Sequence, residues 1–157
     1  MKILVFSDSH HITEPMKKAI KEQSPDMVIH LGDCVKDIKE VSGYFPKLQV
    51  IILSGNNDYG FITPSEKEIT LSGKRFFITH GHRYGVKYSL NSLIDNANLR
   101  KADVLLFGHT HIPYNAFEYG MYIINPGSCS GIFGTPPTFA VLTLEEGKIS
   151  SEILEIK

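Results

Sequence analysis

Side chains that commonly bind metal ions follow five apolar runs of this sequence, each at the point where the run ends. The side chains are Asp8, His10, Asp33, Asn56, His80, His109 and His111. In four of the five segments a glycine stands directly beside such a residue, and glycine permits close approach of the backbone to an ion or a substrate. The loops at the carboxyl ends of strands form the sites of open α/β sheets. We therefore expect these side chains to converge.

The chemical types of these residues indicate the kind of ion. Carboxylates, neutral imidazoles and a carboxamide oxygen, without a thiolate, suit a hard-to-borderline divalent cation. Imidazoles alone would suit zinc, and carboxylates alone would suit magnesium or calcium. Because the set holds more ligands than one ion uses, it predicts two ions, about 3.5–4 Å apart, that share a carboxylate through its two oxygens.

The charge of such a centre indicates its substrate. Two dications, less the charges of two carboxylates and one hydroxide, leave a site of about +1 that attracts a phosphate anion. The ions lower the pKa of the water between them, so a metal-bridging hydroxide is present near neutral pH. We therefore expect in-line hydrolysis of a phosphate ester by that hydroxide, without a covalent enzyme intermediate.

Each segment by itself also has a purely structural explanation. Gly32-Asp33 is typical of a turn after a strand, and the 7–10 segment is typical of a helix start. Packing explains the paired histidines His109 and His111 less easily. Five such segments at strand ends together favour a metal site over five unrelated turns.

The elements that would position these residues alternate between strands and helices. The continuous apolar runs, typical of central strands covered on both faces, are 3–6, 27–31, 50–53, 75–79 and 104–107. Helices are predicted over 13–23, 35–44 and 87–101, the first with Thr13 near its cap and Pro15 just inside it. Two β-hairpins are predicted over 115–124 and 139–156. The pattern predicts an α/β fold in a single domain, residues 1–157.

Composition excludes some partners. The formal net charge of the 157 residues is −1, which offers no electrostatic footprint for nucleic acid or for an anionic membrane. The apolar stretch at the N-terminus is too short for a signal peptide or for a membrane span of roughly 20 residues, so we expect a cytoplasmic protein. Cys34 and Cys129 are too few for a disulfide framework and are expected to pack as small apolar side chains.

Several motifs resemble those of the calcineurin-like metallophosphoesterases, and in particular of the small YfcE-like phosphodiesterase branch. They are Asp8-x-His10, Gly32-Asp33, Gly55-Asn56-x-Asp58, the 80–85 segment, Gly108-His109-x-His111 and the 125–128 segment. The resemblance covers essentially the whole chain. It implies a four-layer αββα sandwich, in which two mixed β-sheets pack face to face with helices outside. It also implies that the 125–128 turn approaches the site and that the protein forms a homo-oligomer, either a dimer or a tetramer, as its relatives often do.

The same resemblance implies a metal assignment. Asp8, His10 and His111 would hold one ion, and Asp33 would bridge it to the second. The second ion would be held by Asn56, His80 and His109. Manganese is the expected metal, with nickel, zinc, cobalt or iron as alternatives.

Asn57 departs from the superfamily pattern, because most members carry a histidine there that is thought to protonate the leaving group. An asparagine donates a hydrogen bond to a phosphoryl oxygen but supplies no proton at neutral pH, and general acid catalysis contributes about 10²–10⁴-fold. We therefore expect a preference for esters with acidic leaving groups, or recruitment of His82 as the acid. Asp58 is expected to hydrogen-bond a ligand imidazole, and His30 to be a core side chain.

Three functions follow from these observations. The first is a phosphoesterase that acts on small phosphodiesters, with monoesters as a second substrate class. The second is a catalytically weak interaction scaffold of the same fold, like the related retromer subunit. The third is a nuclease, which the near-neutral charge disfavours.

Overall fold

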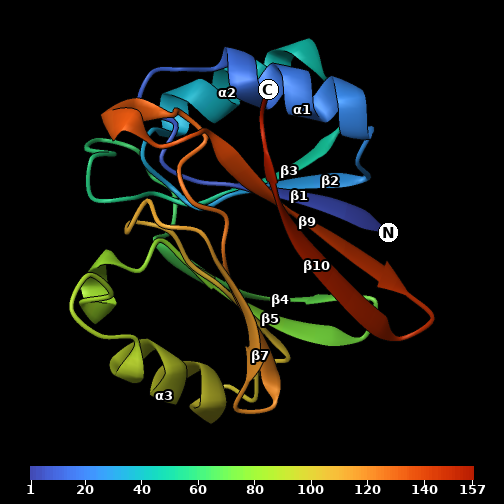
Figure 1. Ribbon diagram of the computed structural model, residues 1–157, viewed down its shortest axis with the longest axis vertical. Helices are drawn as coiled ribbons and strands as arrows, with labels where there is room; N and C mark the ends of the chain where they lie inside the picture. Colours follow the sequence, from blue (N-terminus) through green and yellow to red (C-terminus); the bar gives the residue numbers. More distant parts are fainter.

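Two five-stranded β-sheets lie face to face, and helices cover their outer faces (Figure 1). The computed structural model describes residues 1–157 except for the side chain of Phe133. The first sheet has the order β10-β9-β1-β2-β3, and the second has the order β4-β5-β6-β8-β7. Helices α1 and α2 cover the first sheet, and α3 covers the second (Figure 1). The predicted four-layer α/β sandwich is confirmed.

The bounds of the elements follow in sheet order. The strands of the first sheet are β1 (Lys2–Phe6), β2 (Met27–His30), β3 (Gln49–Ile52), β9 (Thr138–Glu145) and β10 (Lys148–Glu155). Those of the second are β4 (Glu66–Leu71), β5 (Lys74–Thr79), β6 (Val104–Leu106), β7 (Tyr114–Glu118) and β8 (Met121–Asn125). The helices are α1 (Glu14–Gln23), α2 (Val35–Tyr44) and α3 (Asn91–Leu99), with short 3₁₀ turns η1 (His82–Tyr84) and η2 (Ile132–Gly134).

The core has three parts because side chains alternate between the two faces of each strand. In β1, Ile3 and Val5 pack between the two sheets, whereas Leu4 and Phe6 pack against α1 and α2. A third cluster joins the second sheet to α3. Burial on both faces explains why β1 reads as a continuous apolar run.

The parallel strands set the position of the loops that contain the predicted metal ligands. β1, β2 and β3 run parallel in the first sheet, and β5, β6 and β8 run parallel in the second. Since the carboxyl ends of parallel strands lie at one edge of a sheet, the loops after β1, β2 and β3 are neighbours. The same holds for the loops after β5 and β6.

Two elements differ from their predicted extents. β4 was not predicted; it is an edge strand with few apolar residues, joined to β5 by a turn at Ser72-Gly73 in which both residues have positive φ. That turn is typical of a β-hairpin and is the signal that identifies the strand. The predicted helix 87–101 is shortened to α3 (Asn91–Leu99), because the Ser89 hydroxyl accepts a hydrogen bond from the Asn91 backbone N–H and favours a helix start there.

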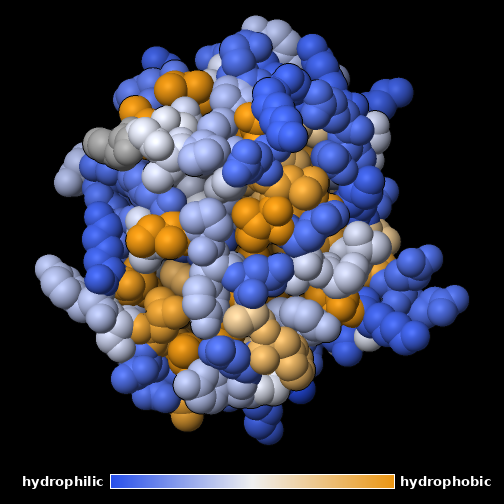
Figure 2. All heavy atoms as spheres, viewed as in Figure 1, coloured by the Kyte–Doolittle hydropathy of each residue, from blue (hydrophilic) through white to orange (hydrophobic). Residues whose placement is uncertain are grey.

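The surface seen in Figure 2 is mostly hydrophilic, with hydrophobic side chains gathered in the middle of the face. Partly buried side chains that pack against the core between the sheets include Tyr122, Ile149 and Ile153. Within the part of the chain that the structure describes, none of the helices has the length and apolar character needed to cross a membrane.

Candidate metal centre

Three glycines allow the five loops to approach one another. A Cβ atom at Gly55 would lie 2.0 Å from Oδ1 of Asp33, and one at Gly32 would lie 2.4 Å from the backbone nitrogen of Gly55. A Cβ atom at Gly108 would lie 2.1 Å from Oγ of Ser7. Because real contacts of this kind exceed 3 Å, these positions accept glycine alone without a shift of the ligand loops.

Asp8 lies at the centre of the cluster. Its Oδ1 atom is 3.2 Å from Nε2 of His111, 3.9 Å from Nε2 of His10 and 4.0 Å from Nε2 of His80. Oδ1 is buried and makes no hydrogen bond among the described residues. Burial by itself raises the pKa of this carboxyl, but the adjacent His111 and His80 imidazoles hold the pKa below its usual value. Asp8 is therefore an anion whose Oδ1 atom faces three imidazoles.

His80 is oriented by the backbone of the first sheet. Its Nδ1 atom donates a 2.9 Å hydrogen bond to the carbonyl oxygen of Leu31. This bond fixes the tautomer, so the lone pair that can bind a metal is on Nε2. Nε2 lies 3.2 Å from Oδ1 of Asn56 and 3.7 Å from Oδ2 of Asp33. A carbonyl contact of this kind is typical of imidazoles that bind metals.

The remaining predicted imidazole ligands lie around the same point. Nε2 of His10 is 3.2 Å from Nε2 of His111, and the ring of His109 is centred 5.1 Å from that of His80. The Asp8 carboxylate raises the pKa of His111, whereas burial lowers the pKa of His109 to about 4. The structure thus gathers all seven predicted ligands at one place.

Asn57 hydrogen-bonds the carboxylate of Asp33, and Asp58 hydrogen-bonds its backbone. The backbone N–H of Asn57 donates to Oδ1 of Asp33 at 2.9 Å, and its side-chain amide donates to Oδ2 at 2.6 Å. Asp58 accepts hydrogen bonds from the backbone N–H groups of Asp33, Gly55 and Val35 at 2.6–2.8 Å. The expected contact of Asp58 with an imidazole is therefore corrected: it joins the loops after β2 and β3 through their backbones.

His82 faces the centre from the 3₁₀ turn η1. Gly81 turns the chain with φ 98°, yet the His82 ring lies 5.4 Å from that of His80. Its buried Nδ1 atom has no hydrogen-bond partner among the described residues. Burial, with the nearby His80 and Arg83 side chains, lowers the pKa of His82, so at neutral pH it is mostly a neutral side chain beside the predicted ligands.

His30 lies in the core behind the centre, as expected. It is fully buried, and its Nδ1 atom accepts a 3.3 Å hydrogen bond from the backbone N–H of Gly32. Burial lowers its pKa to about 4. His30 is thus a neutral packing residue in the folded protein.

Serine and asparagine side chains also support the centre, and two of them come from the 125–128 turn. Ser7 Oγ donates to Asp8 Oδ2 at 2.6 Å, and Ser128 Oγ donates to the Asp8 carbonyl oxygen at 2.8 Å. Asn125 Nδ2 donates to the Gly108 carbonyl oxygen at 3.1 Å. The 125–128 turn therefore approaches the site through Asp8 and the loop after β6.

The residues fit a divalent cation. The Nε2 atoms of His10, His80 and His111 all lie within 4.0 Å of Oδ1 of Asp8. The side chains of Asp8, His10 and His111 form one group whose ligand atoms lie within 4.8 Å of one another, and those of Asp8, Asp33 and His80 form another. Carboxylate and imidazole donors packed in this way suit borderline divalent metals.

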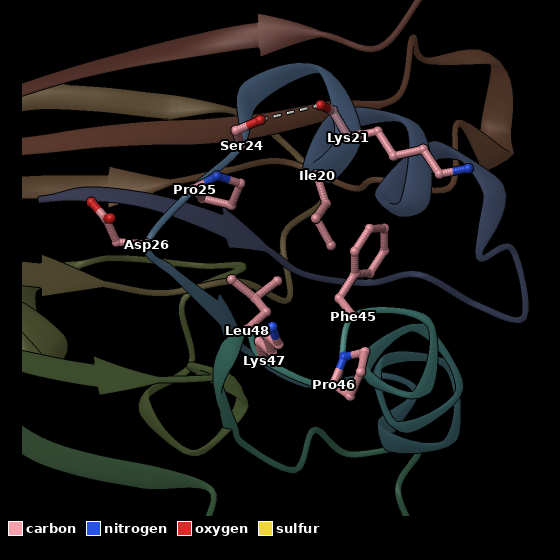
Figure 3. Close-up of a pocket in the computed structure, with 9 residues that line it drawn as sticks. All are labelled: Ile20, Lys21, Ser24, Pro25, Asp26, Phe45, Pro46, Lys47 and Leu48. Atoms are coloured by element: carbon pink, nitrogen blue, oxygen red, sulfur yellow. Dashed lines mark hydrogen bonds between the residues drawn. The ribbon is translucent and has the colours of Figure 1, made fainter.

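A separate pocket lies at the other end of the first sheet. It has a volume of about 570 Å³ and lies between the end of α1 and the connection from α2 to β3. Figure 3 shows Ile20, Phe45 and Leu48 turned toward one another across it, with Lys21 and Asp26 at its rim. None of the seven predicted ligands lines this pocket, so it is distinct from the candidate metal centre.

Comparisons with known proteins agree with this geometry. The family model described as "Calcineurin-like phosphoesterase superfamily domain" matches residues 1–147. The chain is 33% identical over 149 residues to "Probable metallophosphoesterase YsnB" of Bacillus subtilis, which covers 92% of this chain and 85% of the relative. It is 28% identical over 167 residues to "Phosphodiesterase YfcE" of Escherichia coli, covering 90% of this chain and 87% of the relative.

Solved structures share the fold. A predicted phosphoesterase from Streptococcus pneumoniae superimposes with a TM-score of 0.81 at 23% identity, covering 98% of this chain and 88% of that chain. Vps29 of Entamoeba histolytica, solved with zinc, superimposes with a TM-score of 0.79 at 19% identity and covers both chains fully, at 100%. These two structural similarities establish only the fold, whereas the sequence match establishes the family. The chain belongs to the calcineurin-like phosphoesterase superfamily.

Proposed function

We propose that this protein is a dinuclear metal-dependent phosphoesterase that hydrolyses small phosphodiesters. The observation that carries the proposal is the buried Oδ1 atom of Asp8, which makes no hydrogen bond among the described residues and faces three imidazole Nε2 atoms within 4.0 Å. A cation among these atoms satisfies the carboxylate and the imidazoles together. The relatives named as a metallophosphoesterase and a phosphodiesterase support the same reaction class.

The proposed ligand partition follows the superfamily pattern. Asp8, His10 and His111 hold one ion, Asn56, His80 and His109 hold the other, and Asp33 bridges them. Manganese is the proposed metal, with nickel, zinc, cobalt and iron as alternatives. Bound at these residues, the ions supply an activated water as the nucleophile and positive charge against the phosphoryl oxygens.

The protein's own side chains position the bridge and attract the substrate. Asn57 holds both oxygens of Asp33, and since a side-chain amide carries two hydrogens, one N–H stays available for a phosphoryl oxygen. The positive charge of Lys87 contributes to the lowered pKa of His109 and opposes part of the rise in the pKa of His111. The same charge favours entry of an anionic ester into the site.

The site has no strong general acid to protonate the leaving group. Asn57 supplies none at neutral pH, and the lowered pKa of His82 keeps that side chain mostly neutral. We therefore propose that substrates with acidic leaving groups, which depart without a proton, are turned over fastest. His82 contributes as a contact for the substrate.

Metal removal and reconstitution test the proposal. Protein from which a chelator has removed the metal is expected to lose hydrolysis of bis-p-nitrophenyl phosphate. Added manganese should restore the activity, and elemental analysis should then find two ions bound per chain. Binding of a single ion at saturation would contradict the dinuclear centre. An absence of turnover with every divalent metal tested would favour the alternative, an interaction scaffold of the same fold.

A further inference from the structure

A second cluster of metal-binding side chains lies beside the candidate centre and shares no ligand with it. It consists of His11, Cys34 and Asp37, and one potential ligand atom from each lies within 4.8 Å of the others. His11 comes from the loop after β1, whereas Cys34 and Asp37 come from the start of α2. This cluster, named here the thiol cluster, contains a sulfur ligand, which the two groups of the candidate centre lack.

Asp37 contributes a buried carboxylate to the thiol cluster. The residue is 4% exposed. Its Oδ2 atom accepts hydrogen bonds from the Ser9 hydroxyl at 2.6 Å and from the His11 backbone N–H at 2.8 Å. Oδ1 accepts no hydrogen bond from the described residues and lies 3.9 Å from Nδ1 of His11. The carboxylate is thus anchored by one oxygen and open at the other, as a monodentate ligand is.

Cys34 and His11 complete the arrangement. Sγ of Cys34 lies 3.9 Å from Nε2 of His11, at the outer limit for a hydrogen bond to sulfur. Cys34 is 8% exposed, whereas the His11 side chain is 81% exposed. Two donor atoms therefore come from the protein interior and the third comes from a side chain that solvent reaches.

The backbone holds His11 in this position at some cost. His10 and His11 both have positive φ, 42° and 69°, a conformation that is unfavourable for a non-glycine residue. The hydrogen bond from the His11 N–H to Asp37 offsets part of that cost. Since the same bond fixes Asp37, the loop after β1 and the start of α2 are arranged together.

We propose that His11, Cys34 and Asp37 form a third divalent-cation site, one that prefers zinc. A thiolate and an imidazole favour zinc over manganese or magnesium, and a carboxylate is a third ligand zinc accepts at about 2.0–2.2 Å. Binding transfers the thiol proton to solvent. Three protein ligands leave the fourth tetrahedral position to water, on the side that the exposed His11 opens to solvent.

Cobalt(II) is the probe that separates this site from the dinuclear centre. A thiolate bound to cobalt gives an intense near-ultraviolet charge-transfer absorption, and none of the seven predicted ligands of the dinuclear centre contains sulfur. Titration of the chelated protein is expected to give this absorption together with a third equivalent of bound cobalt. Binding of cobalt without any thiolate absorption would overturn the proposal.

Variants assign the absorption to the thiol cluster. Cys34→Ser is expected to abolish it and to remove one equivalent of cobalt, whereas Cys129→Ala, at the other buried thiol, retains it. His11→Ala should weaken cobalt binding at this site by more than about tenfold. Retention of the absorption in Cys34→Ser would overturn the assignment.

A further variant separates this proposal from the dinuclear centre. His80→Ala removes a ligand of that centre but none of the thiol cluster, so it should keep the thiolate absorption while losing metal elsewhere. Circular dichroism of each variant confirms that the fold is retained. If His80→Ala lost the absorption while remaining folded, the third site would not be independent.

Discussion

The side-chain amide of Asn57 donates a 2.6 Å hydrogen bond to Oδ2 of Asp33, while its backbone N–H donates a 2.9 Å hydrogen bond to Oδ1. The residue that departs from the superfamily's histidine therefore holds the proposed bridging carboxylate. The contact that Asn57 makes in this chain positions Asp33. An asparagine at this place therefore fits with a full set of the seven predicted ligands.

Asn57→His is expected to increase the hydrolysis of alkyl phosphodiesters relative to aryl phosphodiesters. An imidazole supplies the proton that a poor leaving group needs, a contribution of about 10²–10⁴-fold, whereas p-nitrophenolate leaves without one. The measurement is kcat/KM for both substrate types. Asn57→Gln keeps an amide and serves as the control, with no relative gain. An equal change for both substrates in Asn57→His would contradict the leaving-group argument.

Removal of a proposed ligand should cost both metal and activity. Asp33→Ala and His80→Ala are expected to abolish hydrolysis and to lower the bound metal below two ions per chain, measured by elemental analysis. His30→Ala is the matched control, because His30 is a buried imidazole that hydrogen-bonds the backbone of Gly32. Loss of metal from the His30 variant, with the fold retained, would show that the ligand assignment is incomplete.

Asp58→Ala should destabilise the protein, because three backbone N–H groups lose a charged acceptor. Hydrogen bonds to charged groups contribute about 1.5–3 kcal/mol each, but bonds to one shared acceptor are not additive, and we expect a total loss of about 3–5 kcal/mol. Urea unfolding of the metal-free protein measures it. Asp95→Ala, at an exposed position of α3, should change stability by less than about 0.5 kcal/mol. Similar values for the two variants would argue against this role of Asp58.

Stability should decrease with decreasing pH through His30. Burial lowers its pKa from 6.5 to about 4 in the folded state, so the unfolded chain binds the proton more tightly. The contribution of His30 is therefore complete above about pH 6.5 and is lost progressively between that pH and about pH 4, on the order of 3 kcal/mol in all. Unfolding of metal-free wild type and His30→Gln at several pH values isolates this contribution. Parallel pH profiles would refute it.

Gly55→Ala should disrupt the centre, since the new Cβ would lie 2.0 Å from Oδ1 of Asp33. We expect loss of metal and of activity. Gly43→Ala is the matched control: it lies within α2, where a Cβ meets nothing within 4 Å, and alanine should stabilise the helix by about 0.5–1 kcal/mol. Normal metal content in Gly55→Ala would mean that the loops have more freedom than the close packing indicates.

Much of the fold could be predicted because its central strands are buried on both faces. The runs at β1 and β2 are almost entirely apolar and are fully or nearly fully buried. β4 was missed because an edge strand has few buried residues, and the start of α3 was misplaced because Ser89 binds the backbone locally. Local hydrogen bonds of this kind are not visible in hydrophobic periodicity.

The sequence alone determined the chemistry, since carboxylate and imidazole side chains at strand ends specify a divalent cation wherever they meet. The tertiary structure decided which atoms meet. The packing of the two sheets face to face decides three contacts. Asp8 faces His111, Asn57 holds Asp33, and Asp58 binds backbone N–H groups and not an imidazole. Contacts between loops distant in the chain are set by strand register and sheet packing, and no local pattern encodes these.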